Sequence, residues 1–366
     1  MQEKIRYEGK IPRIRRILII CFADVVNIVQ GLPIVPAIRL RFPHVEIAWL
    51  VEEANAPLLN RLISLDRLII VKDRCLHSWG EIGELRRRLR AFAPDVTIDL
   101  QGRFRSAFSA WISGSNIRIG FGGNDGREGS RWLNNCLVTP DAEHIVERNM
   151  QLLQHFGICG SSISFDLFEN EIDRYCAELI LSRCGLHGNF AIMCVGADVE
   201  SRLWREERYA GVAEYLAEQW NLPSFVVWGN GCEQKFAERV LSGVAGGAAI
   251  IAPAVTVNEF AAIARRSTLV VGSESVQLHV AAAVGARCLG LLGATDMKRN
   301  APYGEKNCSI QKANGSLRSN RNDRILMDAI DTTSVCDVCD RMLAEILESP
   351  QIITNFKKTT NGQKVA

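Results

Sequence analysis

The sequence alternates short apolar stretches with longer segments of helical periodicity, and it does so in two successive sets. Apolar runs of about four to eight residues between amphipathic helices are typical of parallel sheets, whose strands are buried on both faces. The first set is RILIICF, VEIAWLVE, RLIIVK, DVTIDLQG and IRIGFG; the second is NFAIMCVGA, SFVVWGN, AAIIAPA, STLVVGSE and ARCLGLLG. We therefore expect an α/β protein made of two Rossmann-like halves in series.

The length of 366 residues also favours two domains over one. Residues 144–188 have a helical or irregular pattern and form the natural link between the halves. We expect an N-terminal domain over 1–165, a C-terminal domain over 166–335, and a terminal helix and tail over 336–366. Open α/β sheets bind ligands at the carboxyl ends of their strands, so two such domains are expected to face each other across a cleft that holds the ligands.

Two common nucleotide-binding motifs are missing. Neither half carries GxGxxG after its first strand, and GxxxxGK[ST] does not occur. Their absence argues against a nicotinamide-dependent dehydrogenase and against a P-loop nucleotidase.

Charge and hydropathy limit the partners. The formal net charge is +2, which gives no global argument for nucleic acid. Basic residues cluster in KIPRIRR and LRRRLR, where they suit either an anionic surface or a solvated helix face. No apolar run reaches the roughly 20 residues of a membrane span, and the basic N-terminus lacks the apolar core of a signal peptide. We expect a cytoplasmic protein that touches a membrane surface at most.

The twelve cysteines are scattered along a long chain, and several stand within apolar strands. We interpret them as reduced core residues. Cys336 and Cys339 form a single CxxC pair within a helical apolar pattern, and no second pair follows to complete a zinc site. The sequence therefore predicts packing rather than a metal site there.

Strand-to-helix turns of the second half are candidate anion sites, because a helix N-terminus offers free backbone N–H groups. In CVGADVESRLWREERY, Gly196 follows a strand, Asp198 is polar, and Arg202 is either a diphosphate ligand or an exposed side chain. In VVWGNGCEQKF, Glu233 is either a ribose ligand or a favourable acid in the first turn of a helix.

A third turn lies in GSESVQLHVAAAVGARCLGLLGATD. Ser275 is a good N-cap, Glu274 precedes it, and His279 lies one turn into the helix. On pattern alone, capping and packing explain these residues as well as ligand binding does. Val276 stands where a phosphate-binding turn usually carries glycine, and valine resists positive φ.

The first half offers Asp24 after its first strand, as either a helix cap or a general base. Gln101, Arg103 and Arg105 follow the strand that ends in Asp99.

Together these motifs resemble glycosyltransferase family 9, the ADP-heptose:lipopolysaccharide heptosyltransferases, from about Arg16 to Leu347. The matching pieces, in order, are RRILII, GLPIVPAIRLRFPHVEIAWLVEEANAPLL, DVTIDLQGRFRSA, RIGF with GREGS, HIVERNMQLLQHFGI, GADVESRLWREERYAGVAEYLAE, VVWGNGCE, LVVGSESVQLHVAAAVGARCLGLLGATD and APYG.

The resemblance implies a GT-B fold and inverting transfer of a heptose or related sugar from an ADP-sugar to a lipid-linked or lipopolysaccharide-core acceptor. It implies no metal and no cofactor, and it fits a cytoplasmic protein that is peripheral on the inner face of the cell membrane and does not bind nucleic acid.

The resemblance also assigns donor residues. Arg202 replaces the family's Lys before Trp204 and keeps its charge, and Glu233 matches the acid associated with the nucleoside. The family's D-T-G-x-x-H turn becomes Glu274, Ser275, Val276 and, three residues on, His279. The full donor set expected is Gly196, Asp198, Arg202, Glu233, Glu274, Ser275, Val276, His279 and Thr295. The acceptor set expected is Gln101, Arg103 and Arg105.

The catalytic base is open between two residues. Aligned without gaps on Leu32 and Pro33, the family's Asp becomes Asn27, whose amide cannot act as a base. With compensating length changes, Asp24 is its counterpart. The alternative function is a family member that binds a nucleotide sugar or glycan without transfer.

Overall fold

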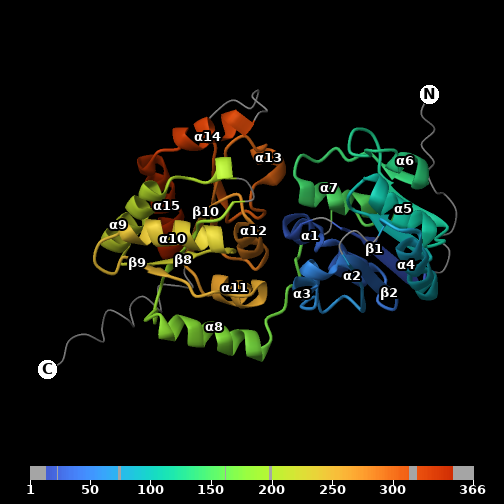
Figure 1. Cartoon of the computed structure of the whole chain (residues 1–366), viewed down its shortest axis with the longest axis horizontal. Coiled ribbons are helices and arrows are strands. Elements are labelled where there is room, and N and C mark those ends of the chain that lie inside the picture. The colour runs from blue at the N-terminus through green and yellow to red at the C-terminus, as the bar shows by residue number, and fades with distance from the viewer. Residues whose placement is uncertain are drawn as a thin grey trace. The chain divides into compact units, whose positions relative to one another are not determined.

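The computed structural model describes residues 14–22, 24–72, 76–160, 162–197, 200–312 and 320–348. The chain divides into two compact units, an N-terminal unit, Met1–Asn170, and a C-terminal unit, Glu171–Ala366 (Figure 1). Each unit has its own parallel sheet with helices packed on it. The two series of strands predicted from the sequence therefore build two Rossmann-like sheets, as expected.

The N-terminal sheet has the order β3-β2-β1-β4-β5-β6, and every neighbouring pair is parallel. The first five strands coincide with the five predicted apolar stretches. The sixth is a three-residue edge strand that the apolar pattern did not reveal. The strands are β1 Arg16–Ile20, β2 Glu46–Glu52, β3 Arg67–Val71, β4 Val96–Asp99, β5 Ile117–Phe121 and β6 Cys136–Val138.

Helix α4 illustrates how local sequence sets the helices of this unit. It starts at a capping box, in which Ser78 and Glu81 bond each other's backbone N–H, and it ends before Ala93 in the left-handed conformation. Leu85, Leu89 and Phe92 recur at helical spacing and pack on the sheet. The other helices are α1 Val25–Gly31, α2 Ile34–Arg41, α3 Ala56–Leu59, α5 Phe104–Ile112, α6 Ser130–Leu133 and α7 Ile145–Gln151, with α4 over Trp79–Phe92 and 3₁₀ turns η1 Glu53–Asn55 and η2 Leu152–Phe156.

The C-terminal sheet has the order β12-β11-β10-β7-β8-β9, again with all neighbours parallel. Numbered within its own unit, this order equals that of the N-terminal sheet, so the chain repeats one topology. The predicted stretches form the first five strands, and a short edge strand was again missed. The strands are β7 Ala191–Cys194, β8 Ser224–Val227, β9 Ala249–Ile251, β10 Leu269–Ser273, β11 Cys288–Leu291 and β12 Cys308–Ile310.

The C-terminal core gathers side chains of the sheet, α9, α10, α14 and α15. Cys336 and Cys339 lie in α15 and are buried in this core, where burial raises the pKa of the Cys336 thiol to about 11 and that of Cys339 as well. Both therefore pack as neutral apolar groups, as predicted. The helices are α8 Glu171–Arg183, α9 Glu206–Trp220, α10 Gly231–Ser242, α11 Val257–Ala264, α12 Val276–Ala283, α13 Met297–Asn300, α14 Asn320–Ala329 and α15 Thr332–Glu348, with the 3₁₀ turn η3 Glu200–Arg202.

The stretch 144–188, predicted to be helical or irregular, contains α7, η2 and α8, and the division between the units falls within it. Within the part of the chain that the structure describes, no helix is both long and apolar enough to cross a membrane.

Candidate functional site

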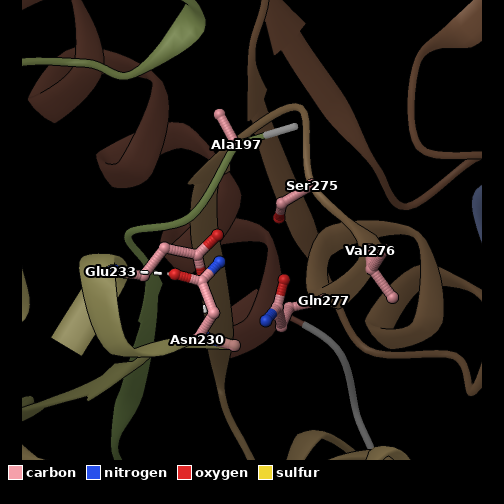
Figure 2. A pocket seen from close by; sticks show the side chains of 7 residues that line it. Ala197, Asn230, Glu233, Ser275, Val276 and Gln277 are labelled. Carbon is pink, nitrogen blue, oxygen red and sulfur yellow. Dashed lines mark hydrogen bonds between the residues drawn. The ribbon is translucent and has the colours of Figure 1, made fainter. Parts of the chain in front are cut away.

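A pocket of about 280 Å³ opens in the C-terminal unit at the carboxyl ends of β7, β8 and β10. Strands β7 and β10 are neighbours at the point where the strand order reverses, which is where doubly wound sheets bind ligands. Figure 2 shows the side chains around it. The lining residues are Ala197, Gly229, Asn230, Glu233, Ser275, Val276 and Gln277.

Glu233 is held in the pocket by the start of α10. Asn230 caps this helix, its Oδ1 accepting from the backbone N–H of Cys232 at 3.0 Å and of Glu233 at 3.1 Å. The Glu233 carboxylate turns back and accepts from the Gly229 N–H at 2.6 Å. A Cβ at Gly196 would lie 2.6 Å from Glu233 Oε2, so this carboxylate occupies the space that a larger residue would fill.

Asn230 and Gln277 line the pocket but were not predicted as site residues. A Cβ at Gly229 would lie 2.7 Å from Gln277 Nε2, so glycine allows α12 to bring this carboxamide close to the β8 turn. Figure 2 shows the Ser275 hydroxyl and the Gln277 carboxamide turned toward Asn230 and Glu233. Asn230 had a usable signal, a cap residue directly after a strand, whereas Gln277 looked like any polar residue in a first helical turn.

Ser275 caps α12, and its Oγ accepts from the Leu278 N–H at 3.3 Å. Val276 is the first helical residue, and it is not among the residues with positive φ. The turn therefore does not need glycine for its backbone conformation. In Figure 2 the Val276 side chain points away from Glu233 and Asn230. Ser275 Oγ takes the Leu278 N–H, so the N–H groups of Val276 and Gln277 are the first-turn donors left for an anion.

Three predicted donor residues converge beside this turn. Arg202 Nη1 lies 3.3 Å from Glu274 Oε2, and the same oxygen accepts from the Thr295 hydroxyl. Gln311 fixes the Thr295 segment by donating from Nε2 to the carbonyl oxygens of Gly293 and Thr295, each at 2.7 Å. The Glu274 side chain is only 13% exposed, and Arg202 is an ion-pair partner of this largely buried charge.

A buried polar network fixes the turn that carries Arg202. Trp204 is fully buried; its backbone N–H donates to Ser273 Oγ at 3.2 Å and its indole N–H to the Ile330 carbonyl at 2.9 Å. The Tyr209 hydroxyl donates to the Cys194 carbonyl at 3.2 Å and lies 3.0 Å from Ser273 Oγ. Burial raises the pKa of Tyr209, so the phenol stays neutral and joins β7, β10 and α9.

Among the described residues, the predicted donor residues Gly196 and His279 do not line the pocket. Gly196 follows β7 beside the pocket, and Asp198 lies outside the described residues. His279 is buried in α12, where its N–H donates to the Ser275 carbonyl at 3.4 Å, and it is not one of the pocket-lining residues. Its assignment to the donor stays a prediction.

In the N-terminal unit, Asp24 is the N-cap of α1. Its Oδ1 accepts from the Asn27 backbone N–H at 3.0 Å and from Asn27 Nδ2 at 2.8 Å. Both side chains are exposed. The structure thus pairs the two candidate base positions with each other, and Asp24 makes the cap that its pattern allowed.

Two of the three predicted acceptor residues, Gln101 and Arg105, contact segments at the equivalent strand ends of the N-terminal sheet. Gln101 Oε1 accepts from the Phe22 N–H at 2.7 Å, which links the segments after β4 and β1. The Arg105 guanidinium lies 4.4 Å from the centre of the Phe22 ring and 2.7 Å from Glu52 Oε1 at the end of β2. Arg103 lies apart from these two contacts, exposed and 4.0 Å from Glu128.

Asp99 underlies this arrangement. It is fully buried and accepts from the N–H groups of Gln101 at 2.9 Å and Gly102 at 3.1 Å, and from Asn134 Nδ2 at 3.0 Å. Burial raises its pKa, against the lowering effect of these hydrogen bonds. Asp99 therefore shapes the turn that carries the predicted acceptor residues.

Two Rossmann-like units, with a pocket at the strand ends of the second, define a protein of the GT-B class, and solved heptosyltransferase structures share this fold. The model of glycosyltransferase family 9 (heptosyltransferase) matches residues 82–326, and the chain belongs to this family. It is therefore a glycosyltransferase.

Among curated relatives, lipopolysaccharide heptosyltransferase 1 of Campylobacter coli is 25% identical over 307 residues, covering 78% of this chain and 86% of the relative. Lipopolysaccharide heptosyltransferase 1 of Pseudomonas aeruginosa is 23% identical over 299 residues, covering 79% and 81%.

Among solved structures, a family 9 glycosyltransferase from Veillonella parvula superimposes with a TM-score of 0.77 at 18% identity, over 90% of this chain and 97% of that one. Heptosyltransferase WaaC of E. coli, solved with ADP-2-deoxy-2-fluoro heptose, gives a TM-score of 0.71 at 20% identity, over 89% and 99%.

Proposed function

We propose that this glycosyltransferase moves a heptose or related sugar from an ADP-sugar to a lipopolysaccharide-core-like acceptor, with inversion and without a metal. Family membership and the names of its relatives support the reaction class. The observation that carries the donor assignment is the pocket at the β7–β10 switch point, which combines an acid, a capped helix N-terminus and a neighbouring arginine.

The polarity of the pocket fits the parts of a nucleoside diphosphate sugar. Glu233 presents a carboxylate that can accept hydrogen bonds from ribose hydroxyls. Ser275 and the first-turn N–H groups of α12 suit phosphate oxygens. Arg202 adds a positive charge for the diphosphate, and Glu274 and Thr295 offer acceptor oxygens to the sugar hydroxyls.

Inverting transfer requires a base for the acceptor hydroxyl and positive charge for the leaving diphosphate. As the acceptor oxygen bonds to the anomeric carbon, the bond to the diphosphate breaks, and a base takes the acceptor's proton. The departing diphosphate gains negative charge, which Arg202 and the α12 N-terminus stabilise electrostatically. Because these groups supply the positive charge, we propose that the reaction needs no metal ion.

Asp24 is the proposed base. Both of its described hydrogen bonds use Oδ1, so a second carboxylate oxygen is available to take a proton. One observation favours the alternative, in which the protein binds donor or glycan without transfer. Asn27 holds the position of the family's Asp in the ungapped alignment, and it is a hydrogen-bond donor to Asp24.

For the acceptor, Gln101, Arg103 and Arg105 provide an amide and two cations on the segment after β4. Such groups suit the phosphates and carboxylates of a lipopolysaccharide core. An acceptor anchored in lipid would bring the protein to the inner face of the cell membrane, and we propose a peripheral cytoplasmic location.

The test is mass spectrometry of a lipid-core acceptor incubated with ADP-heptose and other nucleotide sugars, with and without EDTA. Wild type should add one heptose, and EDTA should leave the rate unchanged. Asp24→Asn keeps a good N-cap but loses the base, so its rate should fall by about 10²–10⁴.

The second variant separates the two alignments. If residue 27 is the catalytic position, Asn27→Asp raises the rate while Asp24→Asn leaves it unchanged, and the base assignment is wrong. No transfer by wild type with any donor, together with tight ADP-sugar binding in calorimetry, would establish the binding-only alternative.

A further inference from the structure

Helices α4 and α5 of the N-terminal unit carry apolar and basic side chains that the donor and acceptor assignments do not use. On α4, Trp79, Arg86 and Arg90 are spaced seven and eleven residues from the first, which places them on one stripe of the helix. The core stripe of the same helix is Leu85, Leu89 and Phe92. The Trp–Arg stripe is therefore a second face, separate from the one that packs on the sheet.

Helix α5 contributes an aromatic ridge at similar spacing. The Phe104 and Phe108 ring centres lie 5.7 Å apart, and those of Phe108 and Trp111 lie 5.8 Å apart. Phe108 also packs on the core that contains the α4 leucines, so the ridge borders α4. Phe104 and Trp111 remain 51% and 54% exposed, which is unusual for adjacent large aromatic side chains.

Helices α4 and α5 lie side by side and are in contact (Figure 1). Arg90 of α4 reaches the end of α5. A Cβ at Gly114, just past the end of α5, would lie 3.7 Å from Arg90 Nε. The α4–α5 surface thus combines Trp79, Phe104 and Trp111 with Arg86 and Arg90. Trp79 is 87% exposed, so a large indole stands in water at one end of it.

Charge on α4 is divided between its flanks. Glu84 pairs with Arg87 at 2.7 Å, and Arg88 donates to the Ile70 carbonyl at 2.8 Å, both away from the Trp–Arg stripe. Among the described residues, no carboxylate lies within ion-pair distance of Arg86 or Arg90. The α4–α5 surface is therefore aromatic and net positive.

We propose that the α4–α5 surface docks on the headgroup region of an anionic lipid bilayer. Tryptophan favours the membrane–water interface because its ring is apolar and its N–H is polar, and arginine is attracted to anionic headgroups. A purely apolar protein surface would leave the charges of Arg86 and Arg90 unmatched, whereas anionic headgroups match them. The inference deepens the proposed function and rests on its lipid-anchored acceptor for biological sense, although lipid binding itself needs neither donor nor acceptor.

The test is flotation of the full chain with vesicles of phosphatidylcholine alone or mixed with phosphatidylglycerol. Wild type should float with the mixed vesicles, and added salt should release it. Arg86→Gln should weaken partitioning about fivefold, the effect of one charge near an anionic surface. Trp79→Ser should weaken it at least as much.

Matched control variants test whether lipid binding depends on this surface in particular or on any exposed charge or aromatic side chain. Arg87→Gln makes the same charge change on the other flank of α4, and Tyr175→Ser removes a 64% exposed aromatic from α8. Both should bind as wild type does. Three results would overturn the proposal. The first is equal binding of wild type to neutral and anionic vesicles, and the second is unchanged lipid binding of Trp79→Ser and Arg86→Gln. The third is a Trp79→Ser variant that loses self-association but still binds lipid. ADP binding in calorimetry reports on the donor site separately, so the two proposals fail independently.

Discussion

Arg202 lies beside Glu274, so a donor diphosphate would replace or join this ion pair. We expect Arg202→Ala to weaken ADP binding about tenfold to a hundredfold, because a charge-assisted hydrogen bond contributes about 1.5–3 kcal/mol. Isothermal calorimetry measures this. Arg239→Ala, which breaks a surface pair with Glu206, is the matched control. Unchanged ADP affinity in Arg202→Ala would contradict the donor assignment.

Asp99 gives a pH-dependent prediction. Its folded-state pKa is raised by burial, so the folded state favours the protonated carboxyl and stability is lost as pH rises above the unfolded value of 3.8. Asp99→Asn removes this loss. Its amide can still accept from Gln101 and Gly102, and rotation of Asn134 offers the buried Oδ1, which has no hydrogen-bond partner in the structure.

We therefore expect Asp99→Asn to match or exceed wild-type stability at pH 8, with the difference shrinking as pH falls toward 4. Urea unfolding across this range is the measurement. Asp99→Ala leaves two backbone N–H groups unpaired and should cost about 2–5 kcal/mol. A wild type that gains stability as pH rises, relative to Asp99→Asn, would show that the hydrogen bonds outweigh burial.

At the scale of the element, α12 serves both stability and the pocket. Ser275→Ala removes its cap and should cost about 1 kcal/mol of unfolding free energy. Thr256→Ala removes the cap of α11 and should cost about the same. Only Ser275→Ala should also weaken ADP binding, since Thr256 does not line the pocket. The measurement is the increase in melting temperature on adding ADP. If α12 does not bind the phosphates, this increase should be the same in Ser275→Ala and Thr256→Ala.

The elements that sequence pattern revealed are those with long apolar runs. Strands β1 and β10 have buried residues at almost every position, so their signal is continuous. Strands β6 and β12 have three residues each and are partly exposed, so no run exists to detect. The sequence left open whether Val276 fits a phosphate-binding turn. Its φ depends on which residue begins α12, and the sequence pattern does not determine that residue.

At the scale of the whole molecule, the repeated topology implies that each unit contains the interactions that stabilise its own fold. The C-terminal unit has its own sheet and core, and α8 packs on α11 within it. We expect a fragment of residues 171–366 to fold cooperatively and to bind ADP in calorimetry while failing to transfer sugar. A fragment that is unfolded by circular dichroism would show that the N-terminal unit is required for stability.

The site was only partly predictable at this scale. Arg202, Glu274 and Thr295 were expected and do converge, because parallel strands bring their carboxyl ends to one edge. Gln277 was not predicted as a site residue. Its position in the pocket depends on the approach of α12 to Gly229, and that approach is set by the tertiary structure. The base remained open because residues 24 and 27 share one helix start, where a cap and a catalytic carboxylate look alike in sequence.

The close approach of Gly196 to the Glu233 carboxylate has an evolutionary consequence. A methyl group at position 196 would displace the Glu233 carboxylate from its present place, so the two residues are coupled although they stand 37 positions apart in the chain. Descendants that keep the acid should keep the glycine. Where a descendant loses the acid, position 196 becomes free to enlarge, and the pocket would then change its preference for the nucleoside.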